Sequence, residues 1–140
     1  MSASYRTVGH RLPRLDGAGK ATGKARYGVD QSLPGMLYAK LVRSTVPHAR
    51  LRAIRTDAAG AMPGVRGIVT AADLPPGRYG SYIKDMEVFA SGKVLYIGHP
   101  VAGVVAATPE EAERAARAVE IEYEALPGVY DIAAALCADA

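Results

Sequence analysis

The glycine- and lysine-rich stretch Gly17–Lys24 is the first place where residue types and spacing could do chemistry. A phosphate-binding P-loop needs glycine five residues before its Gly-Lys pair and Ser or Thr directly after it, so that a hydroxyl reaches the metal ion. Here Ala18 and Ala25 occupy those positions. The stretch also departs from Gly-x-Gly-x-x-Gly, because position 22 is Thr. We therefore interpret it as a flexible turn.

Metal ligation is not predicted for this chain alone. The three histidines, His10, His48 and His99, are far apart, and none forms a His-x-x-x-His pair on one helix face. Cys137 is the single cysteine, which excludes an internal disulfide and any four-thiolate metal or iron–sulfur site.

Two acid–base arrangements can be imagined. Ser44, His48 and Asp57 would form a hydrolytic set only if their side chains converged within hydrogen-bond reach, which their spacing does not require. His48 is better explained as a structural residue in a turn. The alternating glutamates of residues 120–124 are typical of an exposed strand face rather than of buried catalytic acids. No catalytic, cofactor-binding or metal-ligating residue is assigned.

The length of 140 residues, with 49% hydrophobic and 22% charged residues, fits one globular domain. It is short for a redox enzyme that carries its own cofactor domains. The N-terminal residues have no apolar core of the secretory type. The longest uncharged stretch, Val94–Pro109, is shorter than the roughly 20 residues of a membrane helix. A soluble protein is expected, and the single cysteine fits a reducing cytoplasm.

Charge is distributed unevenly along the chain. Residues 1–55 hold eleven Lys or Arg against Asp16 and Asp30, a net +9, and the rest of the chain carries −6. Two interpretations stay open: a stand-alone basic module for nucleic acid, or a surface for an acidic protein partner. The basic arm lacks the interleaved aromatic residues that stack on single strands, which disfavours nucleic acid.

The elements alternate between strand and helix patterns, which predicts a single mixed α and β domain over 26–140 after an extended N-terminal arm over 1–25. Strands are predicted at 36–43, 50–56, 65–70, 93–97, 101–107 and 120–125. Short helices are predicted at 57–62, 71–74 and 132–137. The two strands around Gly98-His99-Pro100 are expected to form a pair, and 75–92 is a long loop. In the first strand, Leu37, Ala39 and Leu41 share one face.

The clearest local signal is the sequence Thr108-Pro109-Glu110-Glu111. Threonine at the N-cap, proline at the first helical position and glutamate three residues after the cap form a capping box. The helix that follows places Ala112, Ala115, Ala116 and Val119 on one stripe.

The order and spacing of several motifs resemble one known family. They are Arg14-x-Asp16-x-x-x-Lys20-x-Thr22-Gly23-x-Ala25-x-Tyr27-x-x-Asp30, Pro47-His48-Ala49-Arg50, Thr70-Ala71-Ala72-Asp73-Leu74, Gly98-His99-Pro100-Val101-Ala102 and the run Val119–Pro127. From about Val8 to Leu136 the chain resembles the a/b hammerhead domain that begins the molybdenum-binding large subunit of the xanthine dehydrogenase and aldehyde oxidase family. At His99 the family usually has Gln, and we infer no catalytic change from that.

The resemblance implies an α+β fold of the a/b hammerhead type and an oxidoreductase system. Such enzymes hydroxylate aldehydes or heteroaromatic compounds at a molybdopterin centre, with water as the oxygen source, and pass electrons through iron–sulfur clusters to FAD. The pterin-binding loops and catalytic glutamate of the family lie downstream of this domain. The chain is therefore expected to be a non-catalytic structural and docking domain. Its basic arm and the loop Pro75–Gly92 would contact the remaining molybdopterin-binding domains or the iron–sulfur subunit.

Overall fold

The computed structural model describes residues 6–137, so the outermost residues of the predicted arm and domain lie outside the described part. It divides the chain into two compact units, 1–34 and 35–140, which are treated separately below. Residues 26–34, predicted as the beginning of the domain, fall in the first unit. They form a 3-10 turn, η1 (Gly28–Asp30), and make no sheet pairing.

The first unit contains a short helix where a flexible turn was predicted, so that prediction is wrong in detail. This helix, α1, covers Gly17–Ala21. The amides of Lys24 and Ala25 both donate to the carbonyl of Gly19, at 2.8 and 3.0 Å, and close the end of the helix. The Thr22 hydroxyl donates to the Ala18 carbonyl at 2.7 Å. Local hydrogen bonds thus hold a helix in a sequence whose glycines disfavour one.

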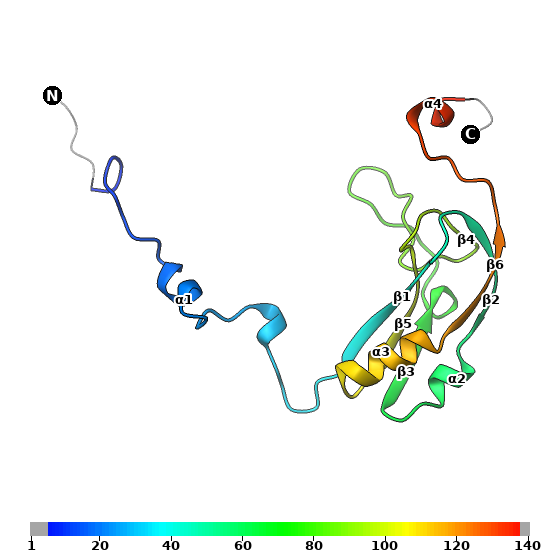
Figure 1. Ribbon diagram of the computed structural model, residues 1–140, viewed down its shortest axis with the longest axis horizontal. Helices are drawn as coiled ribbons and strands as arrows, with labels where there is room; N and C mark the ends of the chain where they lie inside the picture. The colour runs from blue at the N-terminus through cyan, green and yellow to red at the C-terminus, as the bar shows by residue number, and fades with distance from the viewer. Residues whose placement is uncertain (1–5, 138–140) are drawn as a thin grey trace. The chain divides into compact units, whose positions relative to one another are not determined.

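The second unit consists of two small antiparallel sheets and short helices, and it confirms the predicted mixed α and β class (Figure 1). One sheet has the order β1 (Tyr38–Arg43), β5 (Pro100–Ala106), β3 (Val65–Thr70). The other has the order β4 (Lys93–Val94), β2 (Ala49–Arg55), β6 (Glu120–Ala125). The helical elements are α2 (Asp57–Gly60), η2 (Ala71–Asp73), α3 (Pro109–Arg117) and α4 (Ile132–Ala135).

Helix α3 packs on β1 and β5 and covers one face of the first sheet (Figure 1). Its Ala112 and Ala115 are buried, because small side chains let the helix approach the sheet closely. One apolar cluster forms here; its buried members are Val42, Ala59, Ala102, Val104, Ala115 and Val119. A second cluster lies under the other sheet and contains Ala49, Ala90, Val94 and Val101. The predicted apolar stripe of the helix is therefore confirmed.

The predicted pairing of 93–97 with 101–107 is wrong. Strand β4 is only two residues long and pairs with β2, whereas β5 lies between β1 and β3 in the other sheet. The chain turns over Leu95–His99, where the Gly98 backbone has φ of +88°. The Gly98 amide donates to the Ser44 carbonyl at 2.8 Å and the Ser44 amide donates to the His99 carbonyl at 2.9 Å. This turn carries the chain from one sheet to the other.

The face of β1 that packs in the core carries Val42 and not Leu41. Leu41 is 40% exposed, whereas its neighbour Val42 is 8% exposed and lies in the cluster under α3. Lys40 reaches the same helix and forms an ion pair with Glu113. Phe89 lies close to the other face of the sheet, since its Cζ would be 3.2 Å from a β-carbon added to Gly103 of β5.

The capping box of α3 is confirmed, and it contacts a tight turn before β3. The Glu111 amide donates to Thr108 Oγ1 at 3.2 Å, and Glu111 Oε2 accepts from the Thr108 amide at 3.1 Å. Gly64 adopts φ of +83°, and a β-carbon there would collide with the Glu111 carboxylate. The Gly64 carbonyl accepts from the Ala107 amide at 2.9 Å. The absence of a side chain at Gly64 therefore leaves room for the cap.

Candidate docking surface

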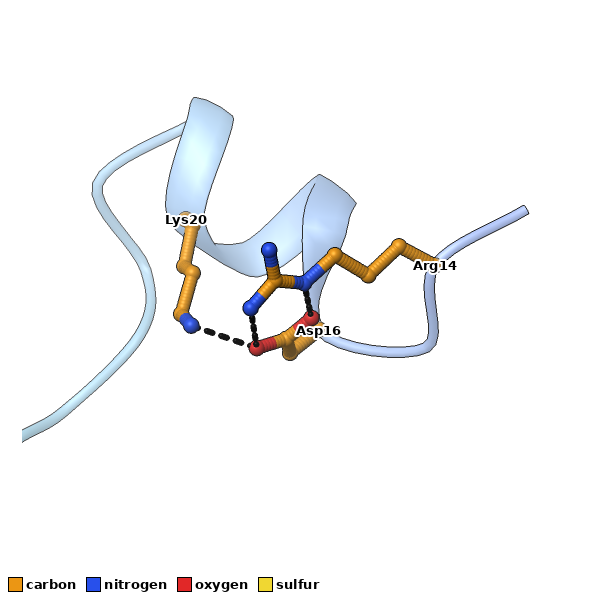
Figure 2. Close-up of polar contacts among 3 residues, drawn as sticks. All are labelled: Arg14, Asp16 and Lys20. Atoms are coloured by element: carbon orange, nitrogen blue, oxygen red, sulfur yellow. Dashed lines mark hydrogen bonds and ion pairs between the residues drawn. The ribbon is translucent and has the colours of Figure 1, made fainter.

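In the first unit, two cations converge on one carboxylate (Figure 2). Arg14 Nε donates to Asp16 Oδ1 at 2.5 Å and its Nη2 donates to Oδ2 at 3.2 Å, while Lys20 Nζ lies 2.5 Å from Oδ2. The Arg14 guanidinium, and then the Lys20 ammonium, hold the pKa of Asp16 below its ordinary value. This ion-pair cluster joins the residue before α1 to its last turn. Arg14, Asp16 and Lys20 are the first residues of the motif that resembles the family, and here their charges stabilise the local structure around α1.

Part of the basic surplus of the N-terminal half is neutralised inside the second unit. On the exposed face of the second sheet, Arg52 of β2 pairs with Glu124 of β6. Arg55 pairs with Glu122 at 3.1 Å and lies 3.9 Å from Glu120. Cross-strand opposite charges stabilise antiparallel strands modestly. The alternating glutamates thus lie on an exposed strand face, as the alternation predicted, and the structure adds that they are ion-paired, so these arginines are less available for an acidic partner.

The basic arm keeps cations that these ion pairs do not use. Within residues 6–137, the cations of the first unit that make no ion pair are Arg6, Arg11, Lys24 and Arg26. Their side chains are exposed. Together with Arg50 of the second unit, which is also exposed and makes no ion pair among the described residues, they are part of the charge asymmetry that stays available to a partner.

Ser44, His48 and Asp57 take three separate local roles. Ser44 Oγ donates to the Val46 carbonyl at 2.7 Å. His48 Nδ1 donates to the Pro127 carbonyl at 2.6 Å and ties the beginning of β2 to the end of β6. Asp57 lies in the first turn of α2. Within the described residues no hydrogen bond joins the three side chains, and His48 stabilises a turn as its sequence context indicated.

Metal donors do not gather in the part of the chain that the structure describes. Among residues 6–137 no group of three or more His, Cys, Asp or Glu side chains could hold a metal ion, and the Cys137 thiol is exposed. The single cysteine cannot supply the four thiolates of an iron–sulfur cluster. The same described residues contain no helix with the length and apolar character needed to span a membrane.

A hollow of about 600 Å³ lies between the loop before β4 and the turn after it. Its walls carry charged side chains and half-exposed apolar ones; the lining residues used below are Arg78, Asp85, Met86, Glu87, Lys93, Leu95, Tyr96 and His99. The Glu87 carboxylate accepts from the amide and hydroxyl of Ser91, both at 2.9 Å. Arg78 Nη2 lies 3.7 Å from Glu87 Oε1. The Ser91 bonds, more than Arg78, lower the pKa of Glu87. Glu87 therefore serves mainly to fix the loop.

His99 is the one strongly buried titratable side chain of this hollow, at 6% exposure. Its Nδ1 accepts from the Leu95 amide at 3.2 Å, and its ring stacks on Tyr96 with centroids 4.6 Å apart. Burial lowers the pKa of His99, against a smaller opposite effect of Glu87. The sequence did not assign a role to His99, because the amide that fixes its ring belongs to a turn that resembled a strand.

Known proteins are similar to this chain in sequence and in fold. A family model described as aldehyde oxidase and xanthine dehydrogenase, a/b hammerhead domain, matches residues 22–127. A probable xanthine dehydrogenase component of Bacillus subtilis is 43% identical over 114 residues, which is 81% of this chain and 15% of that protein. The nicotinate dehydrogenase large molybdopterin subunit of Eubacterium barkeri is 36% identical, over 97% of this chain and 32% of that protein.

Solved structures show the same relation. CO dehydrogenase from Oligotropha carboxidovorans superposes with a TM-score of 0.82 at 38% identity, over 88% of this chain and 16% of that chain. The chain spans less than a third of the length of each of these three proteins.

Proposed function

The chain belongs to the aldehyde oxidase and xanthine dehydrogenase family, of which it forms the a/b hammerhead domain, and on that basis we propose that it is a structural and docking domain of a molybdenum hydroxylase. Family membership and the hammerhead fold were both expected from the sequence, and both are confirmed. The observation that carries the docking role is the coverage. The hammerhead model matches residues 22–127, most of the chain, whereas the chain covers only 15% and 32% of the two relatives described above.

The parent enzyme, in this proposal, oxidises an aldehyde or a heteroaromatic compound with oxygen from water. One relative is named as a molybdopterin subunit, which supports molybdopterin as the cofactor of the parent. Because most of the length of these relatives lies outside the matched region, we assign that cofactor to the remainder of the large subunit. Iron–sulfur clusters and FAD would belong to partner domains or subunits.

Two surfaces support the docking role. The first is the set of cations in the described part of the basic arm that make no ion pair, which suits an acidic neighbour. The second is the segment 79–97 of the second unit, where many large apolar side chains are exposed. They are Tyr79, Tyr82, Ile83, Met86, Val88, Leu95, Tyr96 and Ile97. Concentrated apolar exposure of this kind is typical of interaction surfaces.

The test separates the chain from the rest of the large polypeptide. The 140-residue chain is purified alone and assayed for molybdenum content and for oxidation of aldehydes and heteroaromatic compounds. We expect neither metal nor activity from the chain alone, and stable association when the remaining large-subunit polypeptide is added. Molybdopterin bound by the chain alone, or turnover by it, would contradict the proposal. Steeply salt-dependent binding to DNA in a filter assay would favour the alternative, a basic nucleic-acid module.

A further inference from the structure

The hollow beside His99 has a side chain at its wall whose hydrogen-bonding capacity is incompletely used. The ring is held in place from two sides. The Leu95 amide donates to Nδ1, and the stacked Tyr96 fixes its plane. The backbone around it is fixed as well, since the His99 amide donates to the Tyr96 carbonyl at 3.1 Å. The imidazole is therefore preorganised before anything binds.

The tautomer of His99 follows from its acceptor role. Because Nδ1 accepts a hydrogen bond from an amide, the proton of the neutral ring lies on Nε2, which is then a donor. Burial lowers the pKa of the ring and favours this neutral form near pH 7. Within the described residues, Nε2 makes no hydrogen bond, and it is not among the fully enclosed atoms that lack a partner. It can therefore be reached from outside.

The walls of the hollow indicate the chemistry of an occupant. Arg78 and Lys93 are balanced by Asp85 and Glu87, so a net charge gains little there. The apolar part of the wall is half exposed: Met86 is 48%, Leu95 55% and Tyr96 49% exposed. A neutral, mostly apolar group with one hydrogen-bond acceptor fits this arrangement. A peptide segment with apolar side chains and a free backbone carbonyl has these properties.

We propose that the hollow receives a neutral, apolar segment of the remaining large-subunit polypeptide, and that a backbone carbonyl of this segment accepts a hydrogen bond from His99 Nε2. The inference rests on the proposed docking function and names the surface and the contact that it uses. The remaining polypeptide is the occupant because most of the length of the relatives lies outside the matched region. His99 is a positioning residue of the interface and has no part in chemistry.

The experiment compares amide hydrogen exchange in the isolated 140-residue chain and in the complete large subunit that contains it. In the complete subunit we expect exchange of 78–87 and 93–99 to slow at least tenfold. His99→Leu removes the donor and should weaken association of the chain with the remaining polypeptide by about tenfold. His99→Gln keeps a donor and should stay within about threefold of wild type. Arg66→Leu, at an exposed position of β3 outside the hollow, is the matched control and should have no effect.

The wild-type exchange comparison needs no variant, so the inference stays testable even if His99→Leu fails to fold. Exchange that slows elsewhere in the second unit but not at 78–87 and 93–99 would overturn the inference and leave the docking function intact. Identical exchange throughout the isolated chain and the complete subunit would overturn both. Slowing that appears in the isolated chain as its concentration rises would assign the hollow to a second copy and overturn the inference.

Discussion

Gly64 and Glu111 should be energetically coupled through the N-terminus of α3. Gly64→Ala introduces two separate costs. The backbone at φ +83° is unfavourable for a residue with a β-carbon, by about 1 kcal/mol. The new β-carbon would also displace the Glu111 carboxylate, which now accepts from the Thr108 amide at 3.1 Å. Loss of that capping bond costs about 1 kcal/mol.

The magnitudes predict a double-mutant cycle that is not additive. In the wild-type background Gly64→Ala should lower the free energy of unfolding by about 2 kcal/mol. In the Glu111→Ala background the capping bond is already absent, so the same change should lower it by only about 1 kcal/mol. The expected coupling energy is therefore about 1 kcal/mol, within the range found for contacting residues.

Urea unfolding followed by circular dichroism measures all four proteins of the cycle. If the free energy of unfolding falls with urea by about 2 kcal/mol/M, Gly64→Ala in the wild-type background should lower the urea midpoint by about 1 M. Gly98→Ala is the control, because Gly98 has φ of +88° and an added β-carbon would meet nothing within 4 Å. Its cost should be the same with and without Glu111. Equal costs for Gly64→Ala in the two backgrounds would refute the idea that the carboxylate is displaced.

Two further predictions concern a titration and a hydroxyl. Lys40, and then Arg117, lower the pKa of Glu113 from its ordinary 4.5, so the stabilisation is complete above about pH 4.5 and is lost as pH falls through the folded-state pKa. Lys40→Met should therefore reduce stability at pH 6 but make little difference near pH 2, as thermal melts across this range would show; a constant difference would contradict it. Tyr123→Phe should raise the free energy of unfolding by about 1 kcal/mol, because the Tyr123 hydroxyl is enclosed without a hydrogen-bond partner among the described residues. A clear loss of stability in urea unfolding would show that the hydroxyl has a partner.

Local patterns in the sequence predicted local structure well. The capping box at Thr108 and the apolar stripe after it predicted α3, because both signals depend only on residues within a few turns of one another. Strand β3 covers the predicted residues, and β6 follows the predicted alternation. The uninterrupted apolar run of β5 is typical of a central strand, and β5 lies between β1 and β3.

Features that depend on distant partners could not be predicted in the same way. Whether β4 pairs with β5 or with β2 is decided by the turn at Gly98 and its bonds to Ser44, far back in the chain. The ion pairs between β2 and β6 join residues far apart in the chain, so the charge asymmetry was visible in the sequence but its partial neutralisation was not. The availability of His99 Nε2 as a hydrogen-bond donor depends on the same turn, so the sequence did not predict it either.

Strand β5 has a consequence for how the second unit unfolds. Its Val101 belongs to one apolar cluster, whereas Ala102 and Val104 belong to the other. Ile54 and Ile121 also pack against both. Neither sheet can lose its packing without exposing side chains that the other needs. The two sheets should therefore melt in one cooperative step, with coincident transitions seen by different spectroscopic probes.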